Sequence, residues 1–209
     1  MKNYLFMRSV LTFIGEGRLF TGIVAGALRV LAVLLSLGAL IAWLQMWRTV
    51  FNMGYVAILG GLLFQVFFVV GVYMVVHTFW IRAADIQVVH APEFTVIPIL
   101  SILLKMLGEV YACISLALGV GGGVAALFGD YLGIPGIGVP QSLLYDLLGS
   151  RSPFIAAVLL AVGGAIAAVV WLFLFYVASE MLVALVDIAR NTRTLRGIAE
   201  RHEQTVSNQ

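Results

Sequence analysis

Charged residues are scarce in this sequence. They make up 11% of it, whereas about 25% is usual in soluble globular proteins, and 62% of the residues are hydrophobic. The hydrophobic residues form long runs instead of alternating with polar ones. This composition excludes an ordinary soluble domain and favours an integral membrane protein. The net charge of +2 gives no reason to expect nucleic acid as a partner.

Motifs that bind cofactors or carry out catalysis are also missing. The sequence has no Walker loop, no dinucleotide-binding glycine pattern and no cysteine–histidine cluster. The lone Cys113 has no partner for an intrachain disulfide and is expected to be a small buried residue. The start of the chain is not expected to act as a cleavable signal peptide, because Arg8 interrupts its apolar run. We therefore expect no cofactor, no metal and no catalytic residue.

Four segments are long and apolar enough to cross a bilayer as helices, which takes about 20 residues each. They cover residues 30–47, 55–79, 110–128 and 154–177. The sequence therefore predicts an all-α integral membrane four-helix bundle, with residues 1–209 forming one membrane domain. The fourth helix is expected to continue past Asp187, and residues 190–209 are expected to be a polar cytoplasmic tail.

The basic residues are divided unevenly between the two sides of these spans. Ten of the twelve fall before the first span, between the second and third, or after the fourth. Only Arg48 and Arg151 fall in the other two connections. Because cytoplasmic flanks carry the excess of Lys and Arg, both termini are predicted to be cytoplasmic. The stretch 180–193 resembles the inner helix ends of small bacterial multi-span membrane proteins, which implies a bacterial inner membrane but no activity.

Two further helices are predicted to lie on the membrane surface. Residues 1–20 repeat apolar residues at three- and four-residue steps with basic residues beside them, which suits an interfacial helix on an anionic cytoplasmic leaflet. Residues 133–140 contain two prolines and three glycines and are not expected to be regular helix. Residues 141–148 then form a short amphipathic helix on the outer leaflet. The alternative for this outer segment is a re-entrant element that lines a pore.

Five charged residues near the spans are predicted to form a collar at the cytoplasmic interface. Arg29 lies about 27 Å of helix before Trp47 at the outer edge, and Glu180 lies about 39 Å after Phe154, so neither reaches the bilayer centre. Lys105 and Glu109 are one helical turn apart and are expected to pair. The collar favours a structural ion-pair layer, and a proton or cation relay is the functional alternative. Its members are Arg29, Lys105, Glu109, Glu180 and Asp187.

Gln65 is the one strongly polar side chain predicted near mid-membrane. Interhelical hydrogen bonding is its ordinary role, and pore lining is the alternative.

Asp85, His90 and Glu93 fall within nine residues, a grouping that suggests a metal or acid–base site, although three ordinary surface residues are far commoner. Small residues on the third and fourth helices predict a closely packed pair. The candidate packing residues are Gly119, Gly123, Gly163 and Gly164.

The sequence leaves the activity open between three classes. The first is a non-enzymatic membrane protein that self-associates or serves as an accessory or anchoring subunit of a membrane complex. Its expected partners are the lipid bilayer, anionic lipid at the cytoplasmic face, and further copies or other membrane subunits. The second is a small channel or transporter that uses the charged collar and Gln65. A membrane enzyme that uses Asp85, His90 and Glu93 at the inner surface is the third. The polar tail is expected to be a solvated anchor, and the alternative is that Ile188, Leu195 and Ile198 give it a thin apolar edge for a partner.

Overall fold

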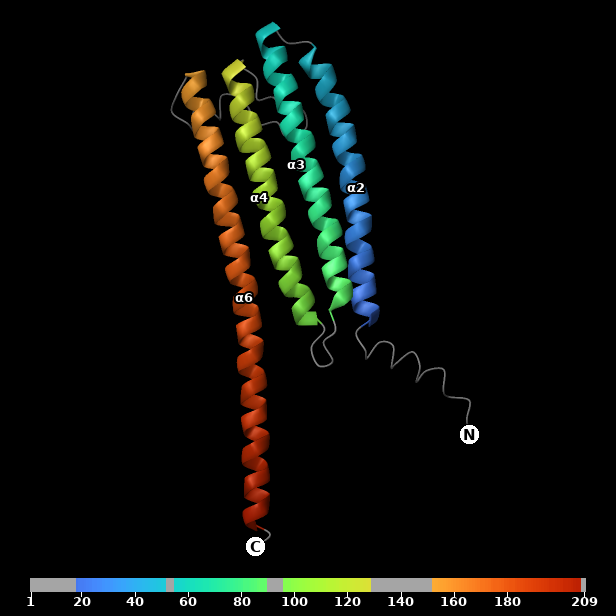
Figure 1. Cartoon of the computed structure of the whole chain (residues 1–209), viewed down its shortest axis with the longest axis vertical. Coiled ribbons are helices and arrows are strands. Elements are labelled where there is room, and N and C mark those ends of the chain that lie inside the picture. The colour runs from blue at the N-terminus through green and yellow to red at the C-terminus, as the bar shows by residue number, and fades with distance from the viewer. Residues whose placement is uncertain (1–17, 52–54, 90–95, 129–151, 208–209) are drawn as a thin grey trace, which may run out of the picture.

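Four long helices make up the regular structure of the described chain. The computed structural model describes residues 18–51, 55–89, 96–128 and 152–207, and it contains no strand within them. Each helix contains a stretch long and apolar enough to cross a membrane, so the prediction of an all-helical protein with four such helices is confirmed. In chain order the helices are α2 (Arg18–Val50), α3 (Tyr55–Val88), α4 (Val96–Phe128) and α6 (Pro153–Ser207) (Figure 1).

The helices are longer than the predicted spans, mostly at one end of the bundle. α2 begins twelve residues before residue 30, α4 begins fourteen before residue 110, and α6 continues thirty beyond residue 177. Counting apolar residues stops a span at the first charges, whereas helical backbone hydrogen bonds continue past them. Two helices have a proline in their first turn, Pro98 in α4 and Pro153 in α6, where the missing backbone N–H costs little. Of the surface helices predicted over residues 1–20 and 141–148, residues 1–17 and 141–148 lie outside the described residues, and residues 18–20 form the start of α2.

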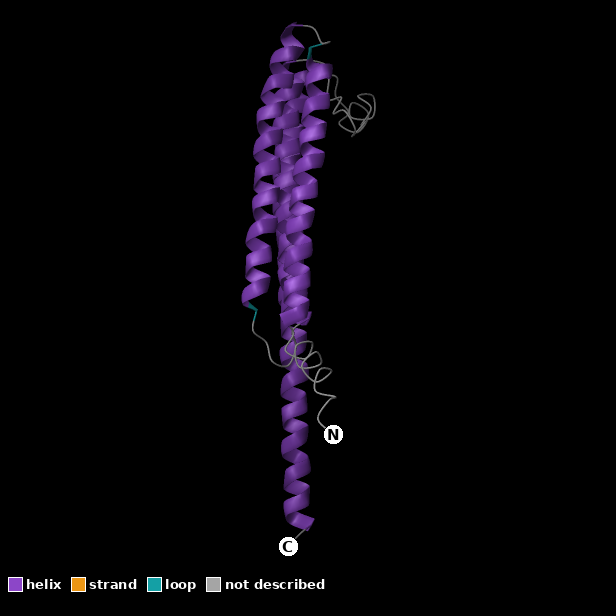
Figure 2. Ribbon diagram, turned by 90° about the vertical axis from the view of Figure 1, so that its right-hand side faces the viewer, coloured by secondary structure: helices purple, strands orange, loops and turns teal. Residues whose placement is uncertain are grey.

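The helices form an open row in which neighbours in the chain are neighbours in space. α2 packs on α3, α3 on α4, and α4 on α6, and the row is broad in one view and narrow in the perpendicular view (Figures 1 and 2). α2 and α6 therefore occupy the two edges. We call the end at which α3 ends, α4 begins and α6 projects the charged end.

Two buried clusters hold the middle of the row together. The larger joins α2, α3 and α4 near the charged end, and the smaller joins the same helices near the opposite end. The first contains Ala25, Leu28, Ala32, Phe79, Ala83, Ile86, Ile99 and Met106. The second contains Met46, Phe64 and Ala125. The apolar side chains on the outer faces of α2 and α6 are exposed, which is the arrangement expected where lipid takes the place of water.

α4 and α6 approach one another through glycines. A Cβ atom built on Gly119 would lie 2.5 Å from the Cα atom of Gly164, and one built on Gly164 would lie 2.6 Å from the carbonyl oxygen of Ser115. A Cβ atom built on Gly123 would likewise lie 2.7 Å from the carbonyl oxygen of Ala157. Gly163, by contrast, has no such neighbour within 4 Å and faces away from α4. Of the four candidate packing residues, three therefore lie in this contact and Gly163 does not.

Candidate functional site

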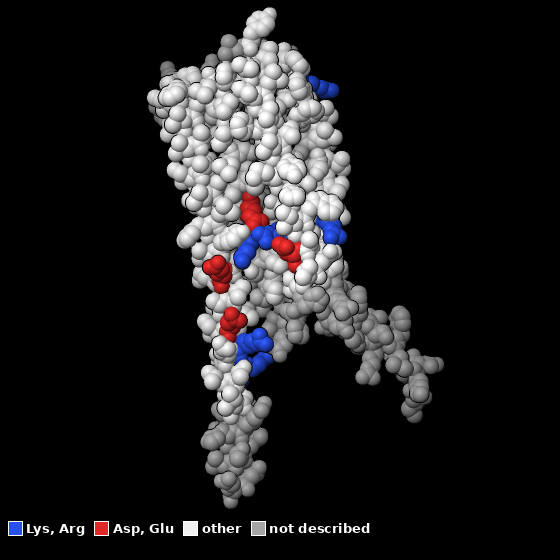
Figure 3. Space-filling view, in the orientation of Figure 1, with Lys and Arg blue, Asp and Glu red and all other residues white. Residues whose placement is uncertain are grey.

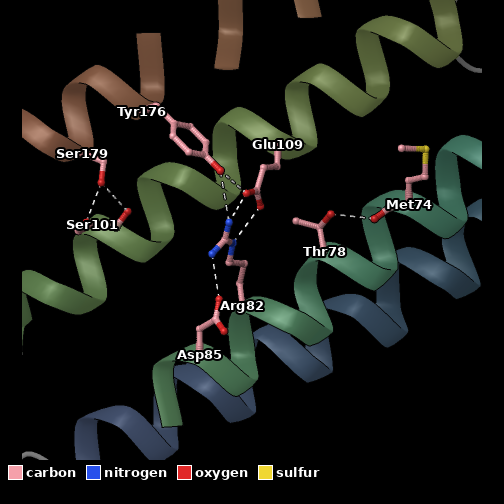
Figure 4. Close-up of polar contacts among 8 residues, drawn as sticks. All are labelled: Met74, Thr78, Arg82, Asp85, Ser101, Glu109, Tyr176 and Ser179. Atoms are coloured by element: carbon pink, nitrogen blue, oxygen red, sulfur yellow. Dashed lines mark hydrogen bonds and ion pairs between the residues drawn. The ribbon is translucent and has the colours of Figure 1, made fainter. Parts of the chain in front are cut away.

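Arg82 on α3 forms the centre of a charged cluster near the charged end. Its Nε donates a hydrogen bond to Oε2 of Glu109 on α4 at 2.9 Å, and its Nη2 donates to the other carboxylate oxygen of Glu109 (Figure 4). Its Nη1 donates to Oδ2 of Asp85, one turn along α3, at 2.9 Å. The guanidinium is planar and its donors lie side by side, so it matches a carboxylate with two parallel bonds. One arginine thereby links α3 to α4 and to its own helix.

Tyr176 brings α6 into the same cluster. Its hydroxyl donates to Oε1 of Glu109 at 2.7 Å and accepts a long contact from Nη2 of Arg82 at 3.5 Å (Figure 4). Lys105 on α4 lies with Nζ 5.5 Å from the centroid of the Tyr176 ring, within the range of a cation–π interaction. The Arg82 cluster, which we define as Arg82, Asp85, Lys105, Glu109 and Tyr176, therefore spans three helices.

The Arg82 cluster is balanced in charge and partly buried. Its two cations face two carboxylates, and the side chains of Arg82 and Glu109 are only 20% and 21% exposed. A partly buried ion pair that is also hydrogen-bonded is costly to break, because each partner would be left as an unpaired charge away from water. The chemistry that follows most directly from this arrangement is the locking of three helices in one register.

A pair of serines adds a second polar link between α4 and α6. Ser101 and Ser179 have their hydroxyl oxygens 2.6 Å apart, and the Ser179 hydroxyl is 3.1 Å from the carbonyl oxygen of Ser101 (Figure 4). Both residues are buried. Ser101 lies seven residues before Gly108, which also contacts α6, so a search for small residues seven apart on α4 could have found it.

Arg29 lies apart from this cluster. Its Nη2 donates to Oε1 of Gln87 at 2.9 Å, and its guanidinium carbon lies 5.8 Å from the centroid of the Trp80 ring. Both contacts join α2 to α3, since Gln87 and Trp80 belong to α3. The predicted collar is thus divided between two places.

The structure gives the predicted collar residues further partners and places two more of them apart from the Arg82 cluster. Lys105 and Glu109 do lie together, but the carboxylate of Glu109 bonds to Arg82 and Tyr176, and Lys105 lies over the Tyr176 ring. Glu180 and Asp187 are exposed on α6 and take no part in the Arg82 cluster. The predicted collar does not include Arg82, Asp85 and Tyr176, because the first two follow the end of the predicted span at residue 79. The continuation of α3 to Val88 turns both into helical residues that face their partners.

Asp85 does not support a metal site within the described chain. It bonds to Arg82, while His90 and Glu93 lie outside the described residues. Among the described residues, no group of three or more His, Cys, Asp or Glu side chains could hold a metal ion.

Comparisons with protein-family models, with curated proteins and with solved structures find no match. The function has therefore to be argued from the geometry alone.

Tyr176 provides the mildest test of the Arg82 cluster. We expect Tyr176→Phe to lower the free energy of unfolding in detergent by about 0.5–1.5 kcal/mol, because the hydroxyl bond to Glu109 is lost while the ring beside Lys105 remains. Unfolding can be followed by the intrinsic tryptophan fluorescence. In an Arg82→Met background the same substitution should cost a different amount, since both residues share Glu109. Equal costs in the two backgrounds would show that the residues act independently.

Gln65 is buried on α3 without a hydrogen-bond partner for its amide nitrogen among the described residues. The side chain is 4% exposed, and Nε2 is the unsatisfied atom. One turn earlier, a Cβ atom at Gly61 would lie 2.7 Å from the Val50 side chain, so Gln65 belongs to the face of α3 that points at α2. An unsatisfied buried donor costs about 1–3 kcal/mol, which stability alone does not justify.

Removing that amide is expected to stabilise the protein. Gln65→Met keeps the length of the side chain and should raise the free energy of unfolding by about 1 kcal/mol. The matched control is Gln87→Met on the same helix, whose amide oxygen accepts a bond from Arg29 and whose loss should not stabilise. Thermal unfolding of both variants in the same detergent makes the comparison. A clear fall in stability for Gln65→Met would mean that its amide has a bonded partner in the membrane.

Proposed function

We propose that this chain is a non-enzymatic, multi-pass membrane protein that works as a self-associating or accessory subunit of a membrane complex. The observation that carries the proposal is the open surface of α6. Only 6% of the residues in its most apolar window are buried by the described chain, against 39% in α4. An edge helix that packs on a single neighbour leaves most of its surface for lipid or for another protein.

The interior of the row supports the same role. The charged side chains of the Arg82 cluster are bonded to one another across α3, α4 and α6, and glycines bring α4 and α6 into backbone contact. Such an interior favours a rigid frame over a water-filled path. A rigid frame with open edges is what an anchoring or self-associating subunit needs.

The proposal includes a location and an orientation. The charged side chains of the described residues gather towards the charged end, from which α6 projects (Figure 3). Most of the Lys and Arg of the sequence also flank that end, and the positive-inside rule would place it in the cytoplasm together with both termini. The same bias suits contact with anionic lipid at the cytoplasmic leaflet of a bacterial inner membrane.

Purification from membranes in a mild detergent tests the subunit role. Native mass spectrometry should find either a defined homo-oligomer or a partner present in fixed stoichiometry. A monodisperse monomer without a partner, in detergent and again in lipid nanodiscs, would contradict the proposal. The modestly destabilised Tyr176→Phe variant is the control. Oligomers that arise only from partial unfolding should be more abundant in this variant than in the wild type.

A small channel or transporter is the second candidate, and Gln65 is the observation that favours it. Polar groups buried in spanning helices without partners are expected where a solute or ion passes. Reconstituted protein should then show a flux that Gln65→Leu or Glu109→Gln alters without loss of folding. Absence of flux in every oligomeric state would leave the subunit role as the sole candidate of the two.

A further inference from the structure

The last part of α6 leaves the row of helices and continues alone. Ser179 lies opposite Ser101, which is five residues from the first residue of α4, Val96. α6 nevertheless extends to Ser207, so its last part projects about 34 Å beyond the start of α4. Both views show it continuing along the axis of the bundle without turning aside (Figures 1 and 2).

This projecting part carries an apolar stripe at alternating steps of four and three residues. The four large apolar members of the stripe are between 61% and 66% exposed. The fifth member, Thr192, donates its hydroxyl to the carbonyl oxygen of Ile188 at 2.8 Å, which leaves its methyl group free to pack. Alternating steps of three and four are typical of the seam of a coiled coil. The stripe, which we call the α6 seam, consists of Met181, Leu185, Ile188, Thr192 and Leu195.

The α6 seam faces away from the other described helices of its own chain. Ser179 marks the side of α6 that is buried against α4. Met181 follows two residues later, which is about 200° around the helix, and Ile188 and Leu195 repeat nearly the same direction. The described part of the chain therefore leaves the seam uncovered.

Lipid is a poor cover for this stripe. The sequence places Glu180 about 39 Å along the helix from Phe154, already past a hydrocarbon core of about 30 Å. An amphipathic helix that binds lipid lies in the plane of the membrane, whereas this one follows the axis of the spanning helices (Figure 1). The apolar seam would thus stand in water if it had no protein partner.

The charges on the projecting part fit a second copy in parallel orientation. Copies inserted the same way in one membrane present their α6 helices side by side and in the same direction, so that each seam residue meets its own counterpart. Four charged residues of this part lie on the far side of the helix in the heptad register, namely Glu180, Asp187, Arg190 and Arg193, whereas Arg196 flanks the seam. In this register Asn191 of one copy faces Arg196 of the other, and no like charges oppose one another.

We propose that two copies of this chain associate through the α6 seam as a parallel two-stranded coiled coil that begins where α6 leaves the row. This inference rests on the proposed self-associating role and names the surface that carries it. The spanning parts of the two α6 helices then lie close together, and their exposed apolar faces on the side of the seam, which include Val170 and Leu174, become part of the same contact.

Disulfide trapping in membranes tests the seam directly. In a Cys113→Ala background, single cysteines are placed at Ile188, Leu195 and Gly197, and the membranes are oxidised. Leu195→Cys and Gly197→Cys form a matched pair, because they lie on the same turn but about 200° apart, and Gly197 has open space around it. We expect same-residue dimers at Ile188→Cys and Leu195→Cys in at least fivefold greater yield than at Gly197→Cys. Equal yields at all three positions, or none at any, would overturn the proposal.

Charge substitution provides the second measurement. Ile188→Glu/Leu195→Glu should weaken dimerisation at least tenfold, whereas Arg193→Glu/Gly197→Glu, on the far side of the helix, should leave it unchanged. Ile188, Arg193 and Leu195 are exposed and a Cβ atom at Gly197 would meet nothing within 4 Å, so tryptophan fluorescence should report the same folded state for both variants. If the wild type forms an oligomer that both variants keep, the seam is not the interface although the subunit role stands. If the wild type is a monomer without any partner, both proposals fail.

Discussion

Replacing Glu109 by leucine should cost about 2–4 kcal/mol of unfolding free energy, the largest single effect that we expect in this protein. Arg82 would keep its charge in a partly buried position but lose both of its bonds to Glu109. Leaving one partner of a buried pair uncompensated is what makes such substitutions severe. Asp85 would still hold one side of the guanidinium, which limits the loss.

The double variant Arg82→Met/Glu109→Leu separates this cause from simple loss of packing. Replacing both partners by apolar residues of similar size removes the unpaired charge, so most of the stability should return. A cycle of the two single variants and the double variant, measured by denaturant unfolding in detergent, gives the coupling energy. Glu180→Gln on the exposed side of α6 is the matched control and should change stability by less than about 0.5 kcal/mol. A double variant that is less stable than either single variant would contradict the account of the Arg82 cluster.

Two adjacent glycines on α6 should respond in opposite ways to the same substitution. Gly164→Ala places a methyl group 2.5 Å from the Cα atom of Gly119 and 2.6 Å from the Ser115 oxygen, and both neighbours are backbone atoms that no rotamer change can move aside. α4 and α6 must then separate, at a cost of about 1–3 kcal/mol. Gly163→Ala meets nothing within 4 Å and should leave stability unchanged or raise it by about 0.5 kcal/mol.

Thermal unfolding of these two variants under identical conditions measures the difference. The pair is closely matched, since the two substitutions add the same atom to neighbouring residues of one helix. Gly119→Ala should behave like Gly164→Ala, because each glycine forms the contact of the other. Equal melting temperatures for Gly163→Ala and Gly164→Ala would show that α4 and α6 do not pack through this contact.

The contrast between Gly163 and Gly164 also shows what the sequence could predict. The small residues of the two helices predict a close pair, because close approach requires short side chains on both. They do not tell which glycine of an adjacent pair faces the partner, since a rotation of about 100° exchanges the two positions. That choice depends on the register between α4 and α6, which the Arg82 cluster and the serine pair help to fix.

Arg82 shows why part of the candidate site could not be read from the sequence. Hydropathy ends the second span at residue 79, so Arg82 and Asp85 were assigned to a connection. The helix continues to Val88, about two and a half turns beyond the apolar run, and this places the Arg82 side chain against Glu109 on α4. Tyr176 is not singled out by the sequence for another reason. A tyrosine near the end of a predicted span is ordinary at a membrane interface, and only its bond to Glu109 distinguishes it.

The alternative pairing of Lys105 with Glu109 illustrates a limit of local rules. Residues four apart on a helix do approach one another, but such exposed pairs contribute only about 0.2–0.5 kcal/mol. An arginine from a neighbouring helix offers two parallel hydrogen bonds in a partly buried site, which is the stronger interaction. Glu109 therefore bonds to an arginine of the neighbouring helix, a partner that the spacing of residues along its own helix does not reveal.

Site-directed thiol labelling tests the central claim, that the four helices cross a membrane with the charged end in the cytoplasm. In the Cys113→Ala background, Tyr55→Cys reports on the opposite end, where Tyr55 is 95% exposed, and Gly197→Cys reports on the projecting part of α6. A membrane-impermeant maleimide added to spheroplasts should label Tyr55→Cys at once and Gly197→Cys only after the membrane is opened. Labelling of Gly197→Cys in sealed spheroplasts, or equal labelling of both cysteines from one side, would contradict the account.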